Sequence, residues 1–88
     1  MYHIFQFFVD TMEGQKLTMK MPLSTKVERL KAELEERTNM APEHQMLMYM
    51  GKSMRNGFSL EHYGLKRHHV VQLVTRVKGG LKINRFYG

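Results

Sequence analysis

The chain has 88 residues, of which 42% are hydrophobic and none is cysteine. This length and composition predict one small domain with an aliphatic and aromatic core, and they exclude disulfides, thiolate metal sites and a thioester-forming nucleophile. The net charge of +6 arises entirely after residue 65, because residues 1–65 hold eight basic and eight acidic side chains. A basic C-terminal quarter either attracts an acidic partner, nucleic acid or an anionic membrane, or only solubilises that end of the chain. Its basic residues are Lys66, Arg67, Arg76, Lys78, Lys82 and Arg85.

Residues 1–4 do not form a basic leader followed by an apolar stretch, so a secretory signal is not expected. No apolar run approaches the roughly 20 residues that a membrane-crossing helix needs. We therefore expect a soluble, monomeric protein of the cytoplasm, the nucleus or both.

The first elements in the chain are two strands over residues 5–10 and 16–21. In both segments every second residue is apolar, which predicts strands with one buried face. Gly14, between them, supplies the positive φ that a hairpin turn or bulge needs. The residues expected to point inward are Phe5, Phe7, Val9, Leu17, Met19 and Met21.

A helix is predicted over residues 26–38. Thr25 and Glu28 have the spacing of a capping box, in which the two side chains satisfy backbone N–H groups at the helix start. Asn39 tolerates the left-handed conformation that ends many helices. The apolar stripe consists of Val27, Leu30 and Leu34.

Three further strands follow the helix. Residues 45–50 predict a third strand, residues 53–54 a short one, and residues 70–77 the last, with an Asn56-Gly57 turn in between. Since nothing else can cover the apolar face of a four- or five-stranded mixed sheet, the single helix must do so. We expect the first and last strands to lie side by side at the centre. This α+β arrangement is the β-grasp.

Residues 5–80 resemble the ubiquitin family over its full length without a gap. The register ends on Gly79-Gly80, and the resemblance implies that Tyr63 has a structural role, with its hydroxyl bonded to backbone near Asn56-Gly57. It also implies a domain over residues 1–80, followed by a flexible basic tail at 81–88. The matching residues are Phe8-Val9, Thr11, Gly14, Lys31-Ala32, Pro42, Gln45, Leu47, Gly51-Lys52, Gly57, Leu60, Tyr63, Leu73-Val74, Arg76 and Gly79-Gly80.

Gly79-Gly80 is the candidate conjugation site. Conjugation needs a terminal carboxylate on an extended arm that fits a narrow channel, and two residues without side chains suit that requirement. Arg76, four residues before Gly80, matches the family. Two features depart from it: Thr75 replaces a leucine that processing and activating enzymes hold, and the chain continues for eight residues beyond Gly80, so a protease must first cut there.

A second candidate site is an apolar patch on the solvent side of the sheet. Met46, Met48 and Met50 have the opposite parity to Leu47 and Tyr49, so both faces of the third strand are apolar. A one-sided sheet does not require this, and an exposed apolar area marks an interaction site unless these methionines fill the core. By resemblance, the partner-binding patch comprises Met12, Met48 and Val74, with Gln72 and Gly51 beside them.

Two lysines, Lys31 and Lys52, match positions on which family members are extended into chains. Lys52, on an exposed turn, is the plausible acceptor, whereas Lys31 is expected on the helix surface. Neither cofactor nor metal is predicted, because the histidines lack ligand spacing and are expected to be solvated loop residues. We also find no nucleophile–base constellation, phosphate-binding glycine loop or catalytic carboxylate pair, so the chain is not predicted to be an enzyme. The histidines are His3, His44, His62, His68 and His69.

The sequence leaves three functional hypotheses open. The chain is a modifier that activating and conjugating enzymes, a processing protease and ubiquitin-like-binding domains recognise, and that is joined to substrate lysines. Alternatively, it is a non-conjugated interaction domain of a larger protein that binds through its apolar patch. In the third hypothesis the basic tail binds RNA, with phosphate contacts and base stacking. The tail residues involved would be Lys78, Lys82, Arg85, Phe86 and Tyr87.

Overall fold

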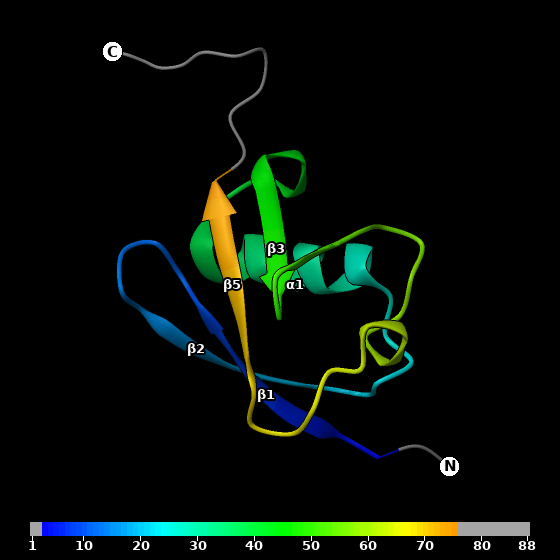
Figure 1. Ribbon diagram of the computed structural model, residues 1–88. Helices are drawn as coiled ribbons and strands as arrows, with labels where there is room; N and C mark the ends of the chain where they lie inside the picture. Colours follow the sequence, from blue (N-terminus) through cyan, green and yellow to red (C-terminus); the bar gives the residue numbers. More distant parts are fainter. Residues whose placement is uncertain (1–2, 76–88) are drawn as a thin grey trace.

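The computed structural model describes residues 3–75 of the chain. Within them, five strands and one α-helix follow one another in the predicted order (Figure 1). Short 3-10 turns at Pro42–His44 and Glu61–Tyr63 lie in the connections. The bounds of the main elements are β1 Phe5–Asp10, β2 Lys16–Met21, α1 Val27–Thr38, β3 Gln45–Tyr49, β4 Lys52–Met54 and β5 Val70–Thr75.

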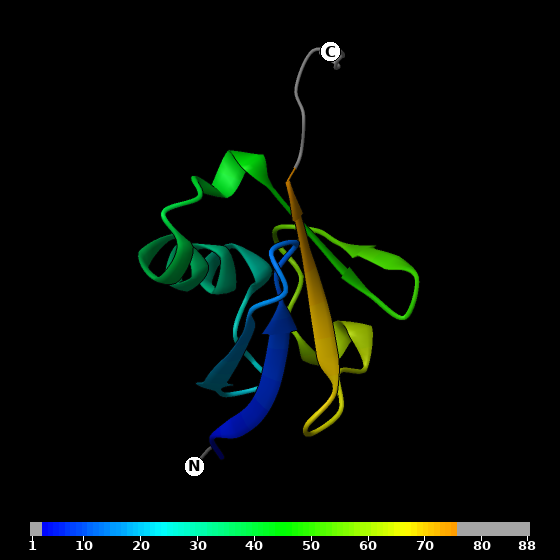
Figure 2. The same ribbon diagram turned by 90° about the vertical axis from the view of Figure 1, so that its left-hand side faces the viewer.

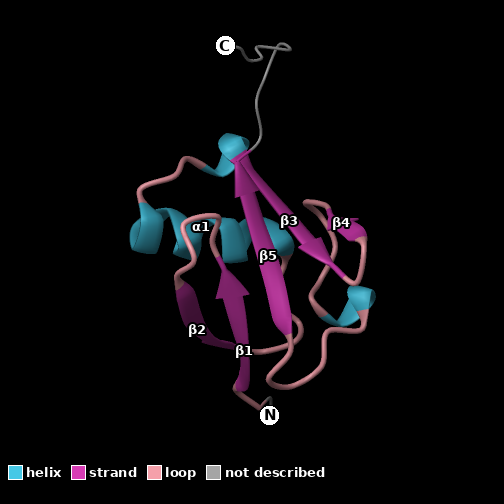
Figure 3. Cartoon of the chain, turned by 60° about the vertical axis from the view of Figure 1, so that its left-hand side comes forward, coloured by secondary structure: helices cyan, strands magenta, loops and turns pink. Residues whose placement is uncertain are grey.

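The strands form one mixed sheet in the order β2-β1-β5-β3-β4. The first and last strands, β1 and β5, run parallel side by side, with Val9 opposite Val71, as the sequence predicts. The other neighbouring strands are antiparallel. The helix α1 crosses one face of the sheet (Figures 2 and 3). This is the β-grasp architecture, so the predicted fold class is confirmed.

The hydrophobic core lies between α1 and the sheet face that packs against it, which we call the inner face. All six residues predicted to point inward from β1 and β2 are buried. Burying a large apolar side chain contributes about 1.5–3 kcal/mol, so this layer is the main source of stability in a chain without cysteine. The largest fully buried apolar side chains are Phe7, Met19, Leu30, Leu34, Leu47, Met54, Leu60 and Leu73.

The start of α1 differs from the sequence prediction. Lys26 is the N-cap residue, and its side chain makes no capping hydrogen bond. The first helical N–H group, at Val27, instead donates to the carbonyl oxygen of Phe58 at 2.9 Å. The Glu28 carboxylate accepts from Gly57 N–H at 2.7 Å. The predicted capping box is therefore wrong, because a loop that is distant in sequence supplies the acceptor and takes up the glutamate.

The end of α1 agrees with its prediction. Asn39 has a φ of 63° and donates its backbone N–H to the carbonyl oxygen of Glu35 at 2.8 Å. This left-handed residue satisfies a carbonyl that would otherwise lack a partner in the last turn of the helix.

The hairpin between β3 and β4 is tighter than predicted. Met50 and Gly51 have φ values of 52° and 79°, so β3 ends at Tyr49 rather than at residue 50. Two consecutive residues with positive φ form the turn that best matches the twist of a two-residue hairpin. At the other end of the sheet, residues 76–77 of the predicted last strand lie outside the described residues.

The loop after β4 is held by Tyr63. Its hydroxyl accepts from Arg55 N–H at 2.8 Å, so the predicted structural role of this tyrosine, beside Asn56-Gly57, is confirmed. The same loop caps α1 through Phe58 and Gly57. The loop and the helix start therefore stabilise each other.

Candidate functional site

We call the sheet face opposite α1 the outer face (Figure 3). The predicted patch residues Met48, Gln72 and Val74 have the strand parity of this face. Met48 of β3 stands directly opposite Gln72 of β5, and Met46 stands opposite Val74. Side chains that are cross-strand neighbours on one face lie close enough to contact one another. Gln72 is exposed, whereas Met48 and Val74 are half-buried.

Met12 joins this surface from the turn between β1 and β2. Its side chain is 67% exposed, and its Sδ atom accepts a hydrogen bond from Thr75 N–H at 3.3 Å. The turn is closed by Thr11 N–H donating to the Gln15 carbonyl oxygen at 2.8 Å. This hydrogen bond holds Met12 beside the end of β5, although Met12 and Thr75 are 63 positions apart in the sequence.

Two shallow hollows show that the patch is continuous. One, of about 240 Å³, is lined by Met12, Gln72 and Val74 together with Asp10, Thr11 and Leu73. The other, of about 330 Å³, is lined by Met48, Gly51 and Gln72 together with Met50 and Val70. Since Gln72 borders both hollows, the structure brings all five predicted patch residues together around it.

Met50 is not among the five patch residues named by resemblance, although it is 74% exposed and borders the second hollow. Strand parity groups it with Met46 and Met48, but its position comes from the turn and not from β3. The available signal was the following Gly51, which is typical of a tight hairpin turn. The methionines of the outer face give it a flexible, polarizable apolar surface.

The two candidate acceptor lysines differ in accessibility. Lys52, on β4, is exposed. Lys31 is only 8% exposed, so its expected position on the helix surface is wrong. It lies four residues after Val27 and therefore at the edge of the buried stripe of α1, where a long aliphatic stem can be covered.

The histidines are less uniformly solvated than the sequence suggests. The Nδ1 atom of His69 lies 2.8 Å from the Tyr49 hydroxyl, and His69 is half-buried. His68 stacks against Phe8 with ring centroids 6.1 Å apart. Over residues 3–75 no cluster of three His, Cys, Asp or Glu side chains could hold a metal ion.

The pKa of the Glu28 carboxyl is lowered by its surroundings. The hydrogen bond from Gly57 N–H holds the pKa of its carboxyl below the usual 4.5, and Lys26 and Lys31 act in the same direction. This group belongs to the start of α1 and not to the outer face.

The candidate conjugation residues Arg76, Gly79 and Gly80 lie outside the described residues, as do the basic and aromatic residues of the tail. Among residues 3–75, no helix has the length and apolar character needed to cross a membrane.

Comparison with known proteins gives matches along most of the chain. The sequence pattern of the "Ubiquitin family" matches residues 7–78. The chain is similar to the NEDD8-like protein RUB3 of Arabidopsis thaliana, with 32% identity over 72 residues that cover 82% of this chain and 92% of that protein. Ubiquitin-like protein 1 of Schizosaccharomyces pombe is 33% identical over 72 residues, with the same two coverages.

A match of another kind involves the E3 ubiquitin-protein ligase UHRF1 of Danio rerio. The two sequences are 37% identical over 70 residues, which cover 77% of this chain but only 9% of that protein. Sequences of this kind therefore occur both as small proteins and as segments of much larger ones.

Proposed function

This chain belongs to the ubiquitin family, and from that premise we propose that it is a ubiquitin-like protein modifier. A protease cleaves the precursor after Gly80, and the new carboxylate is activated and joined to a lysine amine of a target protein. The bond formed is an isopeptide bond, and the chain is the substrate of the processing, activating and conjugating enzymes rather than an enzyme itself.

The observation that carries this proposal is the ungapped family register that ends on Gly79-Gly80. The pattern match reaches residue 78, directly before the two glycines. The NEDD8-like relative supports the proposal, because the aligned region makes up 92% of that protein.

The outer face supplies the recognition surface in this proposal. Met12, Met48 and Val74 provide exposed apolar area from three separate segments, and Gln72 offers a polar contact between them. An apolar patch with a polar centre suits ubiquitin-like-binding domains, which would find the same surface on the free and the attached chain. The protein would act in the cytoplasm or the nucleus, where these enzymes and targets are available.

Intact-mass measurement tests the modifier directly. The purified chain is incubated with ATP and an extract of its own source cells, and loss of residues 81–88 is measured together with the appearance of high-mass adducts. We expect both, and we expect Gly80→Ala to abolish them while Gly88→Ala leaves them unchanged. A chain that stays uncut and unattached contradicts the proposal.

A chain ending at Gly80 separates processing from attachment. This chain already has the required carboxylate, so it should form adducts even if the extract lacks the protease. If it forms none, the modifier hypothesis fails at activation and not at cleavage.

The second candidate function is a non-conjugated interaction domain, which the UHRF1 match favours because there the similar segment is a small part of a large protein. Under this hypothesis, partner binding depends on Met12, Met48 and Val74 but not on Gly80. Binding that persists in Gly80→Ala, in the absence of any adduct, would favour this alternative.

A further inference from the structure

Gln45, at the start of β3, has a buried side-chain oxygen without a partner. Its amide nitrogen donates to the carbonyl oxygens of Lys31 and Met40, both at 2.9 Å. Because carbonyl oxygens only accept, the amide cannot be turned over without losing both bonds. The Oε1 atom must therefore point the other way, where no hydrogen-bond donor meets it, although the residue is only 1% exposed.

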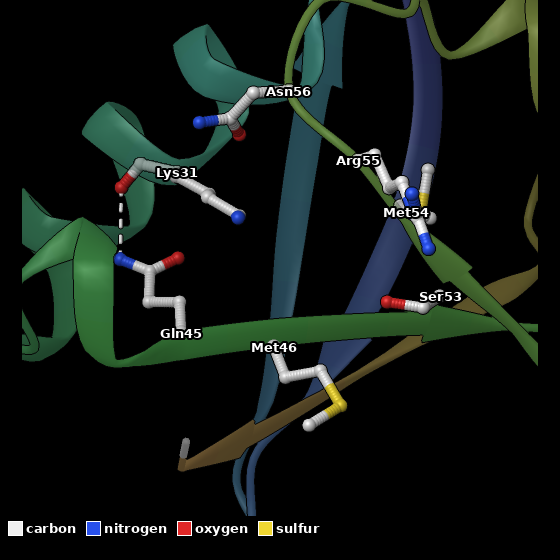
Figure 4. A pocket seen from close by; sticks show the side chains of 7 residues that line it. All are labelled: Lys31, Gln45, Met46, Ser53, Met54, Arg55 and Asn56. Carbon is white, nitrogen blue, oxygen red and sulfur yellow. Dashed lines mark hydrogen bonds between the residues drawn. The ribbon is translucent and has the colours of Figure 1, made fainter. Parts of the chain in front are cut away.

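The unpartnered Oε1 atom of Gln45 is a candidate acceptor for a bound molecule. Leaving a buried acceptor without a donor costs about 1–3 kcal/mol, so such groups in folded proteins usually meet water or a bound molecule. Gln45 is one wall of a pocket of about 490 Å³, a volume within the range of small-molecule sites. Figure 4 shows its Oε1 and the Lys31 amino group pointing into the same space between α1 and β3.

The chemistry of the pocket favours an anion. Lys31 and Arg55 bring two positive charges, and Ser53 and Asn56 add a hydroxyl and an amide that can donate hydrogen bonds. No carboxylate is among the lining residues, which are completed by Gln45, Met46 and Met54. The Glu28 carboxylate, whose pKa is lowered by the Gly57 N–H and also by the charge of Lys31, is not among the lining residues.

The ligand must accept from the cations and also donate one hydrogen bond to Gln45. We propose that this pocket binds inorganic hydrogen phosphate, whose oxygens face Lys31 and Arg55 and whose single O–H group donates to Gln45 Oε1. Sulfate has the same shape and charge but no O–H group at neutral pH, so it leaves the Gln45 oxygen unpaired. A phosphate monoester has a second pKa of about 6 and is likewise mostly without an O–H group at neutral pH.

An NMR titration at neutral pH and constant ionic strength tests the site. We expect sodium phosphate to cause saturable shifts of the backbone amides of Gln45, Ser53 and Asn56, with a dissociation constant of about 1 mM. Sodium sulfate should bind about tenfold more weakly or not at all. This pair of anions tests the role of Gln45 without a substitution in the core.

A charge-matched pair of variants completes the test. Arg55→Gln removes one cation of the pocket but keeps the backbone N–H that binds Tyr63, and it should weaken phosphate binding about tenfold. Arg29→Gln makes the same change of net charge on the exposed face of α1, outside the pocket, and should leave the affinity unchanged. Equal shifts with both anions, equal losses in both variants, or no saturable shift with phosphate each overturn the proposal.

Discussion

Both faces of the sheet carry apolar side chains, but these are buried on the inner face and only half-buried on the outer face. On β3, Leu47 and Tyr49 point to the inner face and are buried, whereas Met46 and Met48 point to the outer face and are half-buried. The inner residues are covered by α1, while among the described residues nothing covers the outer ones to the same extent. Folding therefore explains the apolar residues of one face, and recognition by another molecule is the reason we propose for those of the other.

On the inner side, hydrogen bonds also join the loop after β4 to the start of α1. The loop after β4 caps the start of α1 through Phe58, binds Glu28 through Gly57, and is held by Tyr63. On the outer face, the Thr75 N–H donates to Met12 Sδ and His68 stacks against Phe8. We therefore expect substitutions on the inner side to lower the free energy of unfolding and substitutions on the outer face to weaken binding.

The largest effect is expected in the core between α1 and the sheet. Leu30 is fully buried, so Leu30→Ala removes apolar contacts and leaves a cavity, and it should lower the free energy of unfolding by about 2–5 kcal/mol. Urea denaturation monitored by circular dichroism measures this change. Met48→Ala on the outer face is the matched variant, and an equal loss there would remove the distinction between the faces.

The reverse pattern is expected for binding. Met48→Glu places a charge in the middle of the outer face and should weaken binding to immobilised ubiquitin-binding domains by at least about tenfold. The free energy of unfolding should change by less than about 1 kcal/mol, because Met48 is only half-buried. Thr18→Glu adds the same charge at an exposed position of β2 and should leave binding intact. If both variants bind alike, the patch is not the recognition surface.

A smaller loss of stability is expected when the hydrogen bond between Tyr63 and the loop after β4 is removed. Tyr63→Phe removes the hydroxyl that accepts from Arg55 N–H, which should lower the free energy of unfolding by about 0.5–1.5 kcal/mol. Hydrogen exchange at the Arg55 amide should accelerate in the same variant. An unchanged exchange rate at that amide would show that the contact does not hold the loop.

The smallest effect concerns the pH dependence of stability. Because the folded pKa of Glu28 is depressed, its contribution is present above the unfolded value of about 4.5 and is lost as the pH falls through the folded value. Glu28→Gln should therefore flatten the decline of unfolding free energy below that pH. Thermal unfolding between neutral and acidic pH measures this, with Glu36→Gln on the same helix as the control. Parallel declines in Glu28→Gln and the original chain would exclude a linked role for Glu28.

The strands and the body of the helix could be predicted because their periodicity is local. Alternation identified β1 and β2 to the residue, and the stripe of α1 identified Val27, Leu30 and Leu34. The errors fall where a distant segment competes with a local rule. Glu28 could have capped its own helix, but Gly57 offers it a donor from another part of the chain.

Other features of the structure depend on burial, which the sequence does not state. Lys31 looked like a surface lysine, yet it is buried and borders a pocket that is also lined by residues of β3, β4 and the loop after β4. Gln45 matches the ubiquitin family in sequence, but the sequence does not show that its side-chain oxygen lacks a hydrogen-bond partner. The positions of Met12, Met48 and Val74 beside one another could be anticipated more fully through the family register, whereas their role in binding stays a prediction.

The sequence by itself determined the order of the elements, the inward residues of the strands, the family and the di-glycine, since these depend on short-range spacing and on residue identity. Only the tertiary structure decided how α1 is capped, that Lys31 is buried, that five residues from separate segments meet around Gln72, and that Gln45 faces a basic pocket. The physical reason is that hydrogen-bond partners and solvent exposure are set by segments far apart in the chain, which come together only when the sheet closes against the helix.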